Sequence, residues 1–177
     1  MSTEKKMLIL DLDQTLINSE LLQDLQMYKD DVLKFDIFNM DNHYLVFSRP
    51  HLQDFLEYIF DNFRVSVWTA ASKGYALSII ENILIMGKSN RKLEYIFYSY
   101  HCKQSLSFSK CSKDLKLLWD IYKLNDFTPQ NTFILDDNKN VWKYQKSNCI
   151  RVPPFKNDHK DKYLLELMDR LKLNQML

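Results

Sequence analysis

Glycine is nearly missing from this chain: of its 177 residues, only Gly74 and Gly87 are glycines. This scarcity excludes the glycine-rich phosphate loops with which many nucleotide-binding proteins cradle their ligand. If the protein handles phosphate, it has to do so with side chains, a metal ion and ordinary backbone amides.

A strong charge of either sign is also lacking, since 24 basic and 23 acidic side chains leave a formal net charge of +1. No overall field would draw such a chain onto nucleic acid or an anionic membrane, so we expect neither as a direct partner. The three cysteines are an odd number in a chain long enough to fold without disulfides, which favours a reducing intracellular compartment. The polar segment 1–6 predicts neither a signal peptide nor a membrane span.

Three short apolar runs each end in a polar residue. The runs are 7–10, 64–68 and 132–135, and they lead to Asp11, to Thr69 and to the pair Asp136-Asp137. Such runs are typical of strands buried on both faces. Because a parallel sheet binds ligands at the carboxyl edge of its strands, we expect these polar residues to share one site.

Apolar stripes with helical spacing separate the runs and also close the chain, at 52–60, 76–84, 115–122 and 164–171. The alternation predicts an α/β fold, a three-layer sandwich with a central, mainly parallel sheet. We expect one domain over residues 1–177, with a core at about 5–155, a closing helix at about 159–173 and no large cap domain.

Two segments fit the alternation poorly. We expect 18–36 to form a loop followed by a helix, and 44–47 to form a strand. Residues 95–111 are rich in Ser, Tyr and Phe, and we expect one core strand and a small β insertion there.

Asp11 and Asp13 directly follow the first predicted strand and are separated by a single residue. Two carboxylates so placed repel each other unless a cation lies between them. Mg²⁺ prefers oxygen ligands, and an aspartate beside it can attack phosphorus while a second moves the proton. The alternative is that both residues only cap a turn, as aspartate often does.

The other chemically capable residues shift the balance towards phosphoryl transfer. Asp136 and Asp137 add further oxygen ligands for a metal. The Thr69 hydroxyl and the neighbouring backbone amides can hold phosphoryl oxygens. Lys113, which follows a polar loop, can place a positive charge on both the phosphate and the attacking carboxylate.

These motifs, in this order, resemble those of the haloacid-dehalogenase-like phosphatases, over roughly residues 5–155. More narrowly, they resemble the phosphatases that act on the carboxy-terminal repeat domain of RNA polymerase II. The segments that carry the resemblance are Asp11-Leu12-Asp13-Gln14-Thr15-Leu16, Arg49-Pro50-His51, Trp68-Thr69-Ala70-Ala71-Ser72, Lys113-Asp114-Leu115 and Asp136-Asp137 with Val141-Trp142-Lys143.

For catalysis, the resemblance implies that Asp11 is the nucleophile and Asp13 the general acid and base. It implies that Thr69, Ala70 and Lys113 bind the transferring phosphoryl group. One departure concerns the small relatives, which carry an arginine in the loop before the third motif, near the place of Ser99 here.

For the cofactor, the resemblance implies Mg²⁺ on the Asp11 carboxylate, the Asp13 backbone carbonyl and the Asp137 carboxylate. Asp136 would then orient Lys113 or a metal-bound water.

The resulting hypothesis is a Mg²⁺-dependent phosphatase for phosphoserine or phosphothreonine in an extended peptide, by resemblance the polymerase tail. That substrate would imply the nucleus, and the cytoplasm stays open because no basic localisation run is present. We expect a monomer or a weak dimer.

Other functions stay open. A small-molecule phosphatase of the same superfamily is one, although such enzymes often carry a large cap. A non-catalytic binding module is another, although such relatives have usually lost an aspartate of the first motif. A zinc site at His101, Cys102 and Cys111 would lack a fourth ligand.

Overall fold

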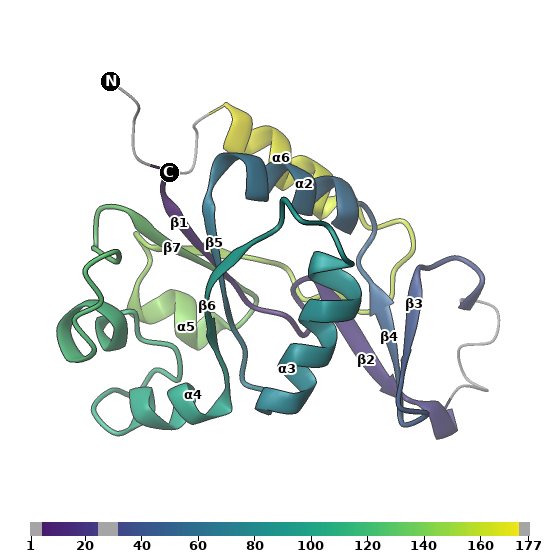
Figure 1. Cartoon of the computed structure of the whole chain (residues 1–177), viewed down its shortest axis with the longest axis horizontal. Helices are drawn as coiled ribbons and strands as arrows, with labels where there is room; N and C mark the ends of the chain where they lie inside the picture. Colours follow the sequence, from purple (N-terminus) through teal and green to yellow (C-terminus); the bar gives the residue numbers. More distant parts are fainter. Residues whose placement is uncertain (1–4, 25–31, 174–177) are drawn as a thin grey trace.

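The computed structural model describes residues 5–24 and 32–173. Its central sheet consists of parallel strands in the order β6-β5-β1-β7-β8 (Figure 1). The strands are β1 (Met7–Leu10), β5 (Arg64–Trp68), β6 (Leu93–Phe97), β7 (Thr132–Asp136) and β8 (Cys149–Arg151). The three apolar runs of the sequence therefore form adjacent central strands, as predicted.

Helices cover both faces of this sheet. One face carries α2 (Leu52–Asn62), α3 (Lys73–Ile79) with its π-helical continuation η2 (Ile80–Ile85), and α6 (Tyr163–Lys172). The other face carries α4 (Ser99–Leu106), the π-helical turn η3 (Leu117–Ile121) and α5 (Lys139–Tyr144). The predicted three-layer sandwich is confirmed.

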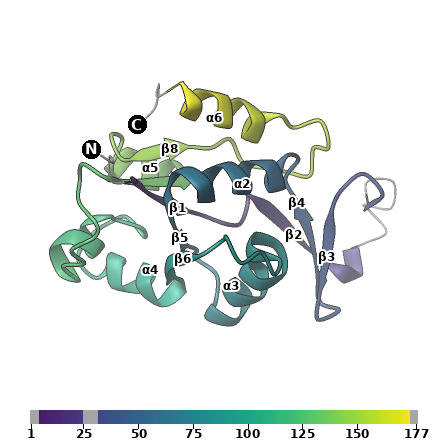
Figure 2. The ribbon, with the colours of Figure 1, turned by 45° about the horizontal axis from the view of Figure 1, so that its top comes forward.

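The sheet has an apolar core on each of its two faces, and the side chains of β1 point alternately into one core and the other. Leu8 and Leu10 pack against α2, α3, η2 and α6, whereas Met7 and Ile9 pack against α4, η3 and α5. Successive side chains of a strand point to opposite faces, so a strand covered on both sides has to be apolar throughout. Helices α2 and α6 lie side by side over the first core (Figures 1 and 2).

A small antiparallel sheet in the order β2-β4-β3 extends from one end of the molecule (Figure 2). Its strands are β2 (Ile17–Leu21), β3 (Ile37–Met40) and β4 (Tyr44–Ser48). The strand expected at 44–47 is thus present. In the segment 18–36, where we expected a loop followed by a helix, β2 occupies the first residues, and residues 25–31 lie outside the described part of the chain.

The position of the β insertion was predicted wrongly. Residues 95–111 contain the end of β6 and then α4, whereas the β insertion lies between β1 and α2. β2 was not predicted, because Asn18, Ser19 and Glu20 show no alternation of apolar and polar residues. These residues form a strand because they pair with the buried strand β4. Among the described residues, no helix combines the length and apolar character needed to cross a bilayer.

Candidate active site

The register of the sheet brings the polar strand ends to one edge. Leu10 of β1 lies between Val67 of β5 and Leu135 of β7, so Asp11 emerges level with Asp136. The Asp11 backbone N–H donates to the Leu135 carbonyl at 2.9 Å, which extends the ladder by one residue and fixes that level. The first site residue is therefore placed by main-chain pairing.

Lys113 is the cation of this site. Its Nζ lies 2.5 Å from Asp11 Oδ1 and 2.7 Å from Asp136 Oδ2, and all three side chains are buried. Lys113 lies in the turn before η3, where the Gln145 amide donates to its backbone carbonyl at 2.8 Å. Burial alone would lower the pKa of Lys113, but the two carboxylates raise it above its usual value, so the ammonium stays charged.

Thr15 holds the second oxygen of Asp11. The Thr15 hydroxyl donates to Asp11 Oδ2 at 2.8 Å, and both residues are buried. The turn that allows this contact passes through Gln14, whose φ of 60° lies in the left-handed region. We did not assign Thr15 to the site from the sequence, although its place four residues after Asp11 in the first motif was a usable signal.

Asp13 has a different partner. The Tyr75 hydroxyl, from the first turn of α3, donates to Asp13 Oδ1 at 2.5 Å. The Ser19 hydroxyl of β2 is hydrogen-bonded to the same Tyr75 hydroxyl. Burial raises the pKa of Asp13, and the Tyr75 hydrogen bond partly offsets that rise. Nothing in the sequence pointed to Tyr75 or Ser19.

Thr69 and Ala70 follow β5 at the same edge. The Thr69 hydroxyl accepts a hydrogen bond from the Ala71 N–H at 3.1 Å. The backbone N–H of Thr69 donates to the Phe97 carbonyl at 3.0 Å. Thr69 is buried, whereas Ala70 is exposed. The two residues thus shape the loop beside the carboxylates, and the structure shows no hydrogen bond from Thr69 to Asp11 or Lys113.

A group of three carboxylates could hold a metal ion. Asp11, Asp136 and Asp137 each offer an oxygen, and these oxygens lie within 4.8 Å of one another. Burial raises the pKa values of Asp136 and Asp137, and the Asp11 carboxylate adds to the rise. One ammonium cannot balance this many carboxylates, so the site fits a divalent cation with a preference for oxygen ligands.

The zinc alternative gains no support from the structure. His101 Nδ1 accepts the Tyr98 N–H at 3.0 Å, and Cys102 Sγ lies 3.6 Å from the Thr69 carbonyl. Over the part of the chain that the structure describes, the aspartate group above is the only set of three or more possible ligand side chains that meets the same distance limit.

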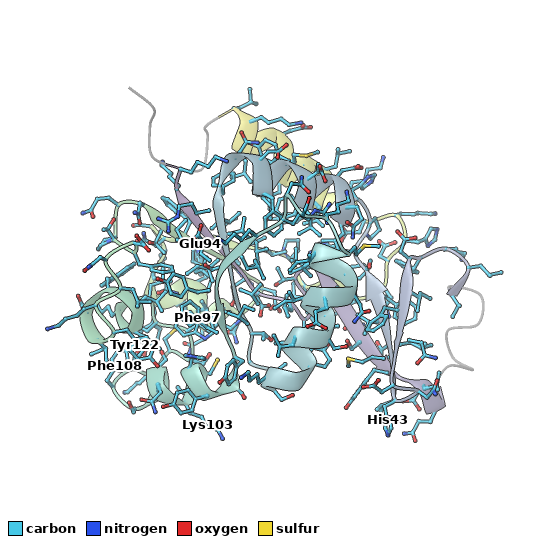
Figure 3. The ribbon with its side chains drawn as sticks, in the orientation of Figure 1. His43, Glu94, Phe97, Lys103, Phe108 and Tyr122 are labelled. Atoms are coloured by element: carbon cyan, nitrogen blue, oxygen red, sulfur yellow. The ribbon has the colours of Figure 1, made fainter. Side chains whose placement is uncertain are left out.

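A pocket of about 270 Å³ adjoins the site on the side of the small sheet. It is lined by residues of the β3–β4 turn and of α3, among them Met40, His43, Tyr44, Ser72 and Tyr75. His43 lies at the end of the molecule opposite Phe108 and Tyr122 (Figure 3). The pocket therefore runs from Tyr75 towards the β3–β4 end of the molecule.

Comparisons with known proteins agree with this architecture. Residues 6–176 match the NLI interacting factor-like phosphatase family. Among solved structures, the polymerase II CTD phosphatase Fcp1 is similar in fold, with a TM-score of 0.58 and 20% identity over 96% of this chain. The match spans 50% of the Fcp1 chain.

Curated relatives are similar in sequence as well. A putative CTD phosphatase-like protein of Invertebrate iridescent virus 6 is 43% identical over 94% of this chain and 97% of its own length. CTD small phosphatase-like protein 2 of Dictyostelium discoideum is 29% identical, and the match spans only 28% of that protein. CTD nuclear envelope phosphatase 1B of Danio rerio is 28% identical over 96% of this chain and 67% of its own length. With a family match over nearly all of its residues, this chain belongs to the NLI interacting factor-like phosphatases, on a haloacid-dehalogenase-like fold.

Proposed function

We propose that the protein is a Mg²⁺-dependent phosphatase of phosphoserine or phosphothreonine in peptides, and that it works through a phospho-aspartate at Asp11. The observation that carries the proposal is the Lys113 ammonium held between the buried carboxylates of Asp11 and Asp136. A nucleophilic carboxylate needs a fixed direction of attack, and Lys113 and Thr15 hold one oxygen each. Each oxygen has a further lone pair with which to attack phosphorus.

In the first step, an Asp11 oxygen forms a bond to phosphorus while the bond from phosphorus to the seryl oxygen breaks. The Asp13 carboxylic acid gives its proton to that leaving oxygen. In the second step, water attacks the phosphorus of the acyl phosphate, Asp13 takes the proton of the water, and phosphate leaves Asp11. Lys113, beside Asp11 throughout, lies where negative charge develops on the phosphoryl oxygens.

The acidic group explains the expected metal. Asp11 and Asp137 would hold Mg²⁺ with their carboxylates and Asp13 with its backbone carbonyl; when bound, the ion would neutralise charge on the phosphoryl oxygens. Asp136 has both oxygens engaged, one by Lys113 and one by the Asn138 N–H at 2.8 Å. These bonds support a role for Asp136 in orienting Lys113.

A pocket beside the site supports a peptide substrate. It lies between α3 and the small antiparallel sheet that is inserted between β1 and α2, and next to Tyr75 it offers room for a side chain of a peptide. The names of the relatives point to the polymerase II tail as the first peptide to test, and such a substrate would place the protein in the nucleus.

The test is hydrolysis of phosphoserine peptides from the polymerase tail, with Mg²⁺ and with excess chelator. We expect metal-dependent release of phosphate, a loss of at least about 10⁴-fold in kcat for Asp11→Asn, and unchanged turnover for Asp61→Asn, an exposed aspartate at the end of α2. After acid quenching during turnover and proteolytic digestion, one phosphoryl group should be found on the fragment of the protein that contains Asp11. Turnover in Asp11→Asn close to that of the wild type would refute the proposed nucleophile.

A further inference from the structure

A relay of two hydroxyl groups ends on Asp13. Tyr75 has a single hydroxyl hydrogen, which it donates to Asp13 Oδ1 at 2.5 Å. In the hydrogen bond between the Ser19 and Tyr75 hydroxyls, Ser19 must therefore be the donor. The relay runs from Ser19 on β2 through Tyr75 on α3 to the turn after β1, and so links three elements at Asp13.

The position of Tyr75 is itself well fixed. Tyr75 lies in the first turn of α3, where its backbone N–H donates to the capping hydroxyl of Ser72 at 3.3 Å. Its ring packs edge-on against Tyr44, with the centroids 6.3 Å apart. A half-buried ring held from two sides can fix the carboxyl group that it contacts.

We propose that Tyr75 is the positioning residue for the proton transfer by Asp13, with Ser19 as its support; this inference rests on the proposed function. Lys113 and Thr15 orient the nucleophile, and neither of them is hydrogen-bonded to Asp13. Tyr75 supplies the corresponding contact for the acid. It engages Oδ1 and leaves Oδ2 as the oxygen that exchanges the proton.

The contact gains strength as the reaction proceeds. While the phosphorus–oxygen bond of the substrate breaks and Asp11 bonds to phosphorus, the Asp13 proton moves to the leaving oxygen and Asp13 becomes a carboxylate. The Tyr75 hydrogen bond then has a charged acceptor, and such bonds are about twice as strong as neutral ones. An interaction that is stronger in the transition state than in the ground state accelerates the step.

The benefit depends on the leaving group. The alkyl oxygen of serine is strongly basic and needs a proton as it departs. Phenoxide is less basic and depends less on protonation, and para-nitrophenoxide departs almost without it. Loss of Tyr75 should therefore affect phosphoserine most and para-nitrophenyl phosphate least. Damage to the overall fold would lower all three rates alike.

The experiment compares kcat/KM, which covers steps up to the first irreversible one, for Tyr75→Phe and the wild type on phosphoserine peptide, phenyl phosphate and para-nitrophenyl phosphate. We expect a loss of about 10-fold or more on the peptide, corresponding to one hydrogen bond, a smaller loss on phenyl phosphate and about twofold or less on the nitrophenyl ester. Ser19→Ala should show the same order with smaller losses. Tyr144→Phe, which removes the hydroxyl of an exposed tyrosine at the end of α5, should change none of the rates.

Results other than this graded loss would contradict the role of Tyr75, the proposed function or both. Equal losses on all three substrates, or no loss on any, would overturn the role of Tyr75 and leave the proposed function standing. A wild-type protein that hydrolyses both aryl esters but not the peptide would refute the peptide substrate, and the two aryl esters would still test Tyr75. A wild-type protein inactive on all three would overturn both proposals.

Discussion

Two buried ion networks in this molecule differ in their balance of charge. Arg49 is paired one to one with Asp161, which it contacts through two nitrogens at 3.1 and 2.7 Å. Its remaining nitrogen donates to the carbonyls of Thr15 and Pro153. Lys113, in contrast, is hydrogen-bonded to two carboxylates, and a third, that of Asp137, lies within 4.8 Å of them.

From this difference we expect the Arg49 network to serve stability and the Lys113 network to serve the proposed function. A buried cation whose charge and hydrogen bonds are all matched needs nothing further, and Arg49 joins the first-motif turn to the segments around Pro153 and Asp161. A site with surplus buried carboxylate is costly on its own, and a divalent cation would balance its charge. Residue type and burial alone would not distinguish the two networks, because both cations are buried.

The largest expected effects come from replacing each cation by methionine. Lys113→Met should lower kcat on a phosphopeptide by about 10³-fold, because the phosphoryl group loses its nearest fixed charge. Arg49→Met should lower the free energy of unfolding by about 3–5 kcal/mol, because it removes the ion pair of Asp161 and the donor of two carbonyls. Urea unfolding and turnover per folded molecule measure the two effects.

Arg49→Lys serves as a milder control in case Arg49→Met does not fold. It keeps the charge and loses the two-pronged contact with Asp161, so its unfolding free energy should lie between those of the wild type and Arg49→Met. A kcat loss in the folded Arg49 variants as large as that of Lys113→Met would show that the two networks are not separate in function.

The next largest effect is on the free energy of unfolding, which should change in opposite directions when Asp137 and Asp161 are each replaced by asparagine. In the absence of metal, Asp137→Asn should raise the free energy of unfolding by up to about 1 kcal/mol, since it removes surplus charge from a half-buried, partly solvent-screened position. Asp161→Asn should lower it by about 2 kcal/mol, because Arg49 loses a charged acceptor. Chemical denaturation of both variants in chelator measures the difference, and destabilisation by Asp137→Asn would contradict the surplus-charge interpretation.

The smallest effect is a pH dependence of stability in chelator. Burial raises the folded-state pKa values of Asp13, Asp136 and Asp137 above the ordinary value of 3.8. Between that value and the raised ones, the folded protein binds more protons than the unfolded chain, so its stability falls as the pH rises. The decrease should be complete above about pH 6, the value to which burial raises the pKa of Asp136.

Unfolding free energies measured from about pH 4 to neutrality test this trend. Asp136→Asn should flatten the slope, and so should saturating Mg²⁺, which favours the ionised carboxylates. A stability that rises steadily over this range in chelator would mean that the carboxylates titrate in the opposite sense.

Much of the fold could be read from the sequence, for identifiable reasons. The strands at 7–10, 64–68 and 132–136 are largely buried on both faces, and such burial favours the apolar runs by which they were predicted. The prediction failed for β2, whose polar residues pair with an apolar neighbour, and for α4, whose stripe is weak because Ser105 is one of its buried residues. In both, tertiary contacts outweigh local preference.

Part of the candidate site could be read in the same way. Asp11, Thr69 and Asp136 were predicted to share a sheet edge, and the parallel register places them there. Their chemical roles stay predictions until the variants are measured. Tyr75 could not be found, because its relation to Asp13 has no periodicity and spans 62 positions.

By itself, the sequence determined which groups are present and which strands carry them, because an apolar run and the polar residue that ends it are encoded side by side. Only the tertiary structure decided which groups are partners. Lys113 meets Asp11 across 102 positions, and Tyr75 rather than Lys113 is hydrogen-bonded to Asp13. Such pairings follow from strand register and from how helices pack on the sheet, and these are properties of the whole chain that no local pattern contains.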